Sequence, residues 1–310
     1  MRVIDLFAGA GGSSEGARQA GATVAWAANH WPLAVEVHQR NHPETEHECQ
    51  DLRQCDWSRV RELRPDVVLA SPACQGHSRA ASAGGRRGSR PKHDADRSTA
   101  WAVVSCIEAT GAPLAVVENV AEFRAWSLYP SWLDALSRLG YTAHEHLVDA
   151  SELGVPQRRV RLFVTLARGR SPLVLELPRR ALTPAAAIVD RSAQRWGPVD
   201  DLPPAARRRL AAAAARFPEG CVVNYVTDDR GHALGEPLTT ITTKHQRAWL
   251  RTRRGVLERR MFTGREYARA MGFPDAYQLT GLVSQDCRLV GNAVCPPVMR
   301  EIVAHIIARG

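Results

Sequence analysis

The chain has 310 residues, a length that can form one large and one smaller domain. Its composition, 45% hydrophobic and 24% charged residues, is typical of soluble globular proteins. No hydrophobic run reaches the roughly 18 residues of a membrane span, and the N-terminus has no signal-peptide pattern. We therefore expect a cytoplasmic protein without a membrane partner. Seven cysteines without a Cys-x-x-Cys pair predict free thiols and no metal site.

The net charge of +9 is concentrated in one part of the chain. Residues 166–255 contain 16 Lys and Arg against 8 Asp and Glu, a net charge of +8. A concentrated basic surface favours a polyanionic partner such as double-stranded DNA, although an arginine-rich surface that only faces solvent has the same composition. Because this region shows no alternation of strands and helices, we predict a separate small domain.

The first predicted elements form a ligand-binding unit. Residues 2–7 predict a strand, residues 8–12 a tight turn, and a helix follows with Ser13 or Ser14 as its N-cap. Glycines between a strand and a helix let a ligand approach the backbone closely, although they also occur in plain turns. The acidic residues that would repel a phosphate here, and favour a cationic or zwitterionic ligand, are Asp5 and Glu15.

Polar residues end the next two predicted strands. The strand 23–28 ends at Asn29, where a ribose-binding side chain usually stands. Asp51 follows a further short segment. Its carboxylate would either accept a hydrogen bond from an adenine amino group or cap the next turn.

A candidate nucleophile follows the hydrophobic strand 67–70. Pro72 ends this strand, so Cys74 lies in the loop beyond it, where open α/β sheets bind ligands. A free cysteine is more often a small buried side chain. The basic stretch 76–98 that follows predicts either a binding loop for a phosphate backbone or a plain surface loop.

Acidic and basic groups follow at the same predicted edge of the sheet. Glu118 ends the strand 114–117 and would act as a helix-cap partner or as a general acid whose pKa is raised by burial. Residues 157–161 lead into the strand 162–166. Alternation along the chain places Arg159 and Arg161 on one face.

Taken together, six stretches resemble the motifs of the cytosine-5 DNA methyltransferases, in that family's order and spacing. The resemblance implies a doubly wound, mostly parallel α/β sheet (a Rossmann-like methyltransferase fold) with a smaller domain. It places catalysis and cofactor binding in residues 1–166 and 256–310 and DNA recognition in residues 167–255. The six stretches are Asp5–Gly12, Pro72–Gln75, Glu118–Val120, Gln157–Arg161, Thr263–Pro274 and Gly291–Val294.

The resemblance also implies roles for single residues. Cys74 corresponds to the nucleophile and Glu118 to the acid, and Arg159 and Arg161 would steady the base. The cofactor would be S-adenosylmethionine, bound by Asp5, Phe7, Ala8, Gly9, Gly11, Asn29, His30, Asp51, Pro72 and Asn292. The other residues implied to contact the DNA substrate are Gln75, Ser78, Arg79 and Asn119.

These residue types suit the chemistry. Carbon 5 of cytosine is too weak a nucleophile to accept a methyl group unaided. Addition of the Cys74 thiolate at carbon 6, with proton donation to N3 by Glu118, turns the ring into an enamine. Arg161 near O2 would stabilise the adduct, and the target base must flip out of the duplex to reach the cysteine.

Three positions depart from the family pattern. Ala73 replaces a second proline, Asn29 a glutamate and His77 an aromatic residue, but no required group is lost.

Two other functions are consistent with parts of the sequence. A tRNA cytosine-5 methyltransferase would share the catalytic residues, although the Cys-Phe-Thr block of that branch is absent. A catalytically silent DNA-binding protein would be expected to lack the cysteine or the glutamate. We expect a nucleoid-associated monomer, with a cognate restriction endonuclease as a candidate partner.

Overall fold

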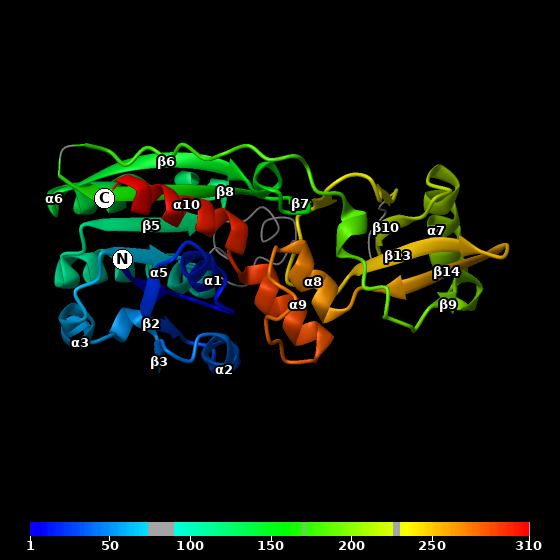
Figure 1. Cartoon of the computed structure of the whole chain (residues 1–310), viewed down its shortest axis with the longest axis horizontal. Coiled ribbons are helices and arrows are strands. Elements are labelled where there is room, and N and C mark those ends of the chain that lie inside the picture. Colours follow the sequence, from blue (N-terminus) through cyan, green and yellow to red (C-terminus); the bar gives the residue numbers. More distant parts are fainter. Residues whose placement is uncertain (74–89, 170, 226–229, 310) are drawn as a thin grey trace. The chain divides into compact units, whose positions relative to one another are not determined.

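The computed structural model describes residues 1–73, 90–169, 171–225 and 230–309, and for residues 90–98 it describes the backbone alone. The chain divides into two compact units (Figure 1). The first comprises Met1–Ala150, Val160–Pro178 and Ala293–Gly310, and the second comprises Ser151–Arg159 and Arg179–Asn292. The functional boundaries at 166 and 255 stay a prediction, because this division follows contacts and not roles.

Among the residues that the structure describes, no helix has the length and hydropathy that crossing a membrane requires. No group of three or more His, Cys, Asp or Glu side chains in the same part of the chain is arranged to hold a metal ion.

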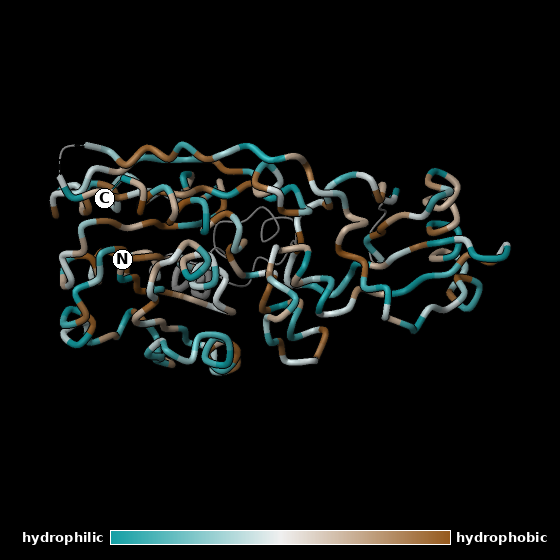
Figure 2. The backbone as a smooth tube through the Cα atoms, viewed as in Figure 1, coloured by the Kyte–Doolittle hydropathy of each residue, from teal (hydrophilic) through white to brown (hydrophobic). Residues whose placement is uncertain are grey.

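A seven-stranded sheet is the centre of the first unit. Six of the seven strands run in the same direction and only β8 runs against them, which confirms the predicted doubly wound, mostly parallel sheet. Hydrophobic residues are concentrated on its central strands (Figure 2). In spatial order the strands are β3 (Glu46–Cys49), β2 (Thr23–Asn29), β1 (Arg2–Leu6), β4 (Val67–Ala70), β5 (Leu114–Asn119), β8 (Val160–Arg168) and β6 (Tyr141–Asp149).

Helices cover both faces of this sheet. One face carries a hydrophobic core that includes Ile4 and Leu6 and is covered by α3 (Trp57–Glu62), α5 (Arg90–Thr110) and α6 (Tyr129–Arg138). Because side chains alternate along a strand, Asp5 points to the other face, where its carboxylate bonds Ser14. The helices on that side are α1 (Gly12–Gln19), α2 (Pro32–Asn41) and α10 (Pro296–Arg309).

The start of α1 differs from the prediction. The helix is capped by Gly11 in the left-handed conformation (φ 84°), which glycine adopts without strain, so the predicted serine N-cap is wrong. Ser13 and Ser14 are instead buried in the first turn. The hydroxyl of Ser14 donates to Asp5 and is not used as a cap.

Glycines in α1 serve packing and not only the turn. A Cβ at Gly12 would lie 2.0 Å from the carbonyl oxygen of Val294, and one at Gly16 would lie 2.5 Å from that of Pro296. Any larger residue would therefore push α10 away from α1.

The structure describes only the end of the stretch 76–98, which was predicted to be a loop. Because α5 begins at Arg90, the end of this predicted loop is helical, and Pro91 suits a first helical turn, where no backbone N–H bond is needed. Residues 74–89 lie outside the described part of the chain.

The second unit contains an antiparallel five-stranded sheet that packs against α7 (Pro204–Arg216) over its own hydrophobic core, which includes Leu210 and Leu250. In spatial order its strands are β11 (His232–Ala233), β10 (Cys221–Asn224), β13 (Arg247–Arg253), β14 (Val256–Met261) and β9 (Gly197–Pro198). The outer end of the β13–β14 hairpin is hydrophilic (Figure 2). The remaining elements are the strand pair β7 (Gln157–Arg158) and β12 (Leu238–Thr239), and the helices α8 (Gly264–Ala270) and α9 (Val283–Asn292).

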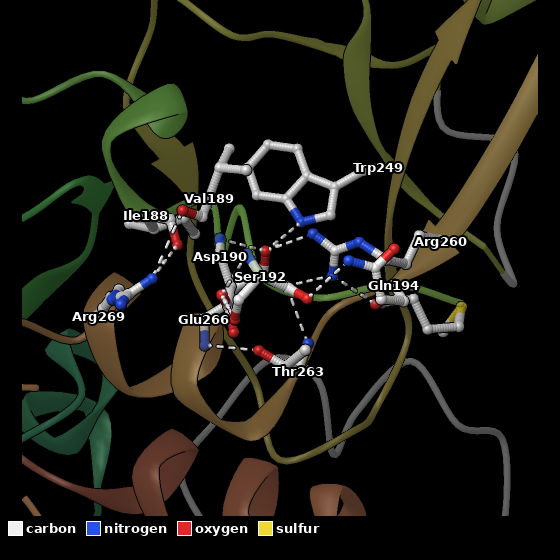
Figure 3. A network of polar contacts seen from close by, with 11 residues as sticks. Ile188, Val189, Asp190, Ser192, Gln194, Trp249, Arg260, Thr263, Glu266 and Arg269 are labelled. Carbon is white, nitrogen blue, oxygen red and sulfur yellow. Dashed lines mark hydrogen bonds and ion pairs between the residues drawn. The ribbon is translucent and has the colours of Figure 1, made fainter. Parts of the chain in front are cut away.

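A buried carboxylate joins the hairpin to α8 (Figure 3). Glu266 is fully buried, and its two oxygens accept two hydrogen bonds from the guanidinium of Arg260, at 2.7 and 2.9 Å. The same carboxylate accepts from the indole of Trp249 and from the backbone N–H groups of Asp190 and Thr263, each at 2.9 Å. With Thr263 as N-cap these contacts complete a capping box at the start of α8.

Candidate active site

Three predicted cofactor residues meet at one edge of the seven-stranded sheet. Phe7 follows β1, Asn29 ends β2, and Asp51 follows β3, and these three strands are parallel neighbours. Backbone bonds link the strand ends, from the Ala8 N–H to Ala28 and from the Gln50 N–H to Asn29. The arrangement matches the position where open α/β sheets bind nucleotides, beyond the carboxyl ends of their strands.

The turn after β1 leaves room for a ligand. Phe7 and Gly9 both have positive φ (60° and 56°), and a non-glycine residue in this conformation is typical of functional sites. A Cβ at Gly9 would meet only the carbonyl oxygen of Phe7, at 3.8 Å, among the described residues. The half-buried turn therefore has space beside its backbone, which fits an adenosine ligand stacked on Phe7.

Two of the polar residues at this edge, Asn29 and Asp51, already have protein contacts. Asn29 accepts a hydrogen bond from the Trp31 N–H through its side-chain oxygen. Asp51 caps the short helix at 52–54 by accepting from the Arg53 N–H, and hydrogen bonds from Arg53 lower the pKa of its carboxyl. The capping alternative for Asp51 is therefore what the structure shows, and its contact with adenine stays a prediction. His30 is exposed.

The backbone that leads to the predicted nucleophile is held at two points. The side chain of Asn119, which is buried, donates to the carbonyl of Pro72 at 3.2 Å. The N–H of Ala73 donates to the hydroxyl of Thr99 at 3.1 Å. A proline at position 73 would have no N–H to donate.

The remaining predictions for this loop concern residues that the structure does not describe. They are Cys74, Gln75, His77, Ser78 and Arg79.

Glu118 and Arg161 form an ion pair on neighbouring strands. The distance between Arg161 Nε and Glu118 Oε1 is 3.3 Å, and the two side chains are mostly buried, with exposed fractions of 19% and 11%. Glu118 directly precedes Asn119, the last residue of β5, and the side chain of Asn119 donates to the carbonyl of Pro72. The ion pair therefore lies near the backbone that leads to Cys74. The structure thus brings together the predicted acid Glu118, the predicted arginine Arg161 and the residues just before Cys74.

Arg159 and Asn292 belong to the second unit. Arg159 is buried and donates to the carbonyls of Ile241 and Gly291, at 3.0 and 3.1 Å. Asn292, at the end of α9, is exposed. The base contact of Arg159 and the cofactor contact of Asn292 stay predictions.

Two further residues of the site were missed by sequence reasoning. They are Thr99, which accepts from the Ala73 N–H, and His38, which bonds Ser14. Their partners lie 26 and 24 residues away along the chain, so no local pattern indicates them.

A sequence model described as C-5 cytosine-specific DNA methylase matches residues 1–196 and 215–308. The chain belongs to this family. The C-5 cytosine-specific DNA methylases use S-adenosylmethionine as methyl donor, and the open turn at Phe7–Gly9 fits that ligand.

Similar proteins include bacterial type II methyltransferases. M.AgeI of Thalassovita gelatinovora is 34% identical over 173 residues, which are 53% of this chain and 39% of that protein. M.HgiDI of Herpetosiphon aurantiacus is 34% identical over 166 residues, 53% of this chain and 51% of that protein. The chain thus spans about half the length of these two relatives or less. M.AplI of Arthrospira platensis is 28% identical over 319 residues and is covered to 85%.

Solved structures support the methylase fold. The structure of Spodoptera frugiperda DNMT2 has a TM-score of 0.73, an identity of 18%, and coverage of 99% of both chains. That of Entamoeba histolytica EhMeth has a TM-score of 0.72 and 15% identity, covering 100% of this chain and 98% of that one. At these identities the likeness shows the fold alone.

Proposed function

We propose that this chain transfers a methyl group from S-adenosylmethionine to carbon 5 of cytosine in duplex DNA. The family match along nearly the whole chain carries the proposal. The Glu118–Arg161 pair beside the anchored loop of the cysteine supports it with the required acid and cation in one place.

In the proposed mechanism the sulfur of Cys74 adds to carbon 6 of a flipped-out cytosine. The electron pair of the 5,6 double bond shifts toward N3, which takes a proton from Glu118, and carbon 5 becomes nucleophilic. Arg161 stabilises the charge that develops on the ring and orients Glu118. The bound cofactor supplies the methyl group. A water molecule then takes the proton from carbon 5, the sulfur–carbon bond breaks to release the Cys74 thiolate, and N3 returns its proton to Glu118, which restores the aromatic ring.

The competing substrate is tRNA. Transfer of labelled methyl groups from S-adenosylmethionine to duplex DNA and to tRNA, measured side by side, distinguishes them. We expect label in DNA alone, and label in tRNA alone would overturn the proposal. The names of the type II relatives also support a cognate restriction endonuclease as partner. A place at the nucleoid would follow from the proposed binding to DNA.

A substitution at Phe7 tests whether the turn after β1, residues 7–11 (here called the cofactor turn), binds S-adenosylmethionine. Phe7→Ala should weaken S-adenosylmethionine binding by about 1–3 kcal/mol, the size of base–aromatic stacking, and change DNA affinity little. Calorimetric titration of wild type and variant checks this. Equal cofactor affinities would remove Phe7 from the binding site.

A substitution at Thr99 tests whether its hydrogen bond to Ala73 positions the backbone before Cys74 for catalysis. Thr99→Val removes the acceptor for the half-buried Ala73 N–H and should lower kcat about tenfold, since the lost hydrogen bond contributes about 1–1.5 kcal/mol to holding the backbone before Cys74. Cofactor affinity should stay unchanged, and Thr99→Ser, which keeps the hydroxyl, should restore turnover. Wild-type turnover in Thr99→Val would show that this bond does not matter for catalysis.

We further propose that residues 167–255 recognise DNA. Arg207 and Arg208 are exposed on α7, whereas Arg209 donates to the carbonyl of Tyr225 and is half-buried. Arg207 and Arg208 are therefore the better candidates for phosphate contacts.

Salt dependence tests these arginines. The double variant Arg207→Gln/Arg208→Gln should flatten the plot of log affinity against log salt by about 0.9 per lost phosphate contact. Arg138→Gln, on the exposed surface of α6, is the matched control and should keep the wild-type slope. An unchanged slope in the double variant would exclude both arginines from the phosphate contacts.

A further inference from the structure

Three histidines lie close together behind the cofactor turn. The ring centroids of His38 and His42 are 4.6 Å apart, and those of His38 and His47 are 4.9 Å apart. His38 and His42 are buried, and His47 is half-buried. None of them has a role in the mechanism proposed above.

A chain of hydrogen bonds connects this cluster to Asp5. The Ser14 hydroxyl donates to Asp5 Oδ2 at 2.7 Å, His38 Nε2 lies 2.9 Å from the Ser14 oxygen, and His38 Nδ1 lies 2.8 Å from His47 Nε2. Asp5 lies on β1, just before the turn, and Ser14 lies in the first turn of α1, just after it. Their bond therefore ties the two ends of the turn together, from β1 to α1.

The chemistry fixes the direction of every bond when Asp5 is ionised. A carboxylate only accepts, so Ser14 uses its one proton on Asp5 and must accept from His38 Nε2–H. Neutral His38 then has a free lone pair on Nδ1 and accepts from His47 Nε2–H. Burial lowers the pKa of His38 well below its usual value and also lowers that of His47, which keeps both rings neutral, as this chain requires.

We infer that His38 is a positioning residue of the cofactor turn, because its donation to Ser14 holds the serine hydroxyl on the carboxylate of Asp5. The inference rests on the proposed function, since it assumes that the turn binds S-adenosylmethionine. Burial raises the pKa of Asp5 to about 7, so the carboxylate needs such support near neutral pH. The other charged or titratable groups around the cluster are Glu15 and Arg18 on α1 and His42, which directly follows α2.

The test is calorimetric titration of S-adenosylmethionine into four proteins: wild type, His38→Phe, Ser14→Ala and the double variant. We expect a dissociation constant about five- to tenfold higher in each single variant, and in the double variant no higher than in Ser14→Ala, because both changes break one chain. His38→Gln, whose amide can donate to Ser14, should restore affinity. His144→Phe, which breaks a histidine–histidine contact on β6, is the matched control and should bind as wild type does.

The pH profile separates positioning from packing. Loss of the His38 bond disfavours the Asp5 carboxylate, so the pH below which affinity falls should move upward in His38→Phe. The ligand's own groups titrate alike in both proteins and cancel in the comparison. A uniform loss at all pH values, or effects of His38→Phe and Ser14→Ala that add, would overturn the inference. So would equal affinities in wild type and both single variants, whereas no binding by the wild type would overturn the proposed function as well.

Discussion

Cys74→Ser should lower kcat by at least about 10³-fold while the fold and the affinity for S-adenosylmethionine stay unchanged. The serine hydroxyl has almost no anionic fraction near neutral pH, so addition to carbon 6 of cytosine fails. Methyl transfer to duplex DNA measures the loss, and calorimetric titration of the cofactor shows that binding survives.

Two comparisons make this prediction specific. Cys49→Ser, at an exposed cysteine, should retain wild-type turnover. Duplex DNA with 5-fluorocytosine at the target should give a covalent adduct with the wild type, since fluorine cannot leave as a proton does, and none with Cys74→Ser. Substantial turnover by Cys74→Ser would show that another group is the nucleophile.

Glu266→Gln should lower the free energy of unfolding of the second unit by about 3–5 kcal/mol. The change leaves the guanidinium of Arg260, which is only 3% exposed, buried without its counter-charge. It also replaces one carboxylate oxygen with an NH2 group, so either the Trp249 indole and the Asp190 N–H or the Thr263 N–H lose their acceptor. Urea unfolding followed by tryptophan fluorescence measures the effect.

The control for this prediction is an exposed ion pair. Asp134→Asn breaks the pair with Arg138 on the surface of α6 and should leave the unfolding curve unchanged, because solvent already screens these charges. If Glu266→Gln unfolded like wild type, the buried network would contribute little to the stability of the second unit.

The sequence predicts those features that depend on neighbouring residues. The hydrophobic run 67–70 forms β4, and the stretch 114–117 forms most of β5, so the strand that leads to Pro72 and the strand that carries Glu118 could be placed correctly. The order of the motifs also identified the family, because each motif is a continuous stretch.

Contacts between distant residues could not be predicted in this way. Ser14 has the residue type and position of an N-cap, and only the packing of α1 on β1 directs its hydroxyl to Asp5. Glu266 suits the first turn of a helix, yet it also bonds Asp190, 76 residues earlier. Such roles depend on which elements meet in the fold, and a single sequence shows only the elements themselves.

Bisulfite sequencing of DNA from cells that express this chain tests the central claim most directly. Cytosines methylated at carbon 5 resist conversion, so we predict unconverted cytosines at every copy of one short sequence. They should be absent from cells with the Cys74→Ser variant at equal expression. Complete conversion of all cytosines in cells that contain the folded wild-type protein would contradict the proposed activity.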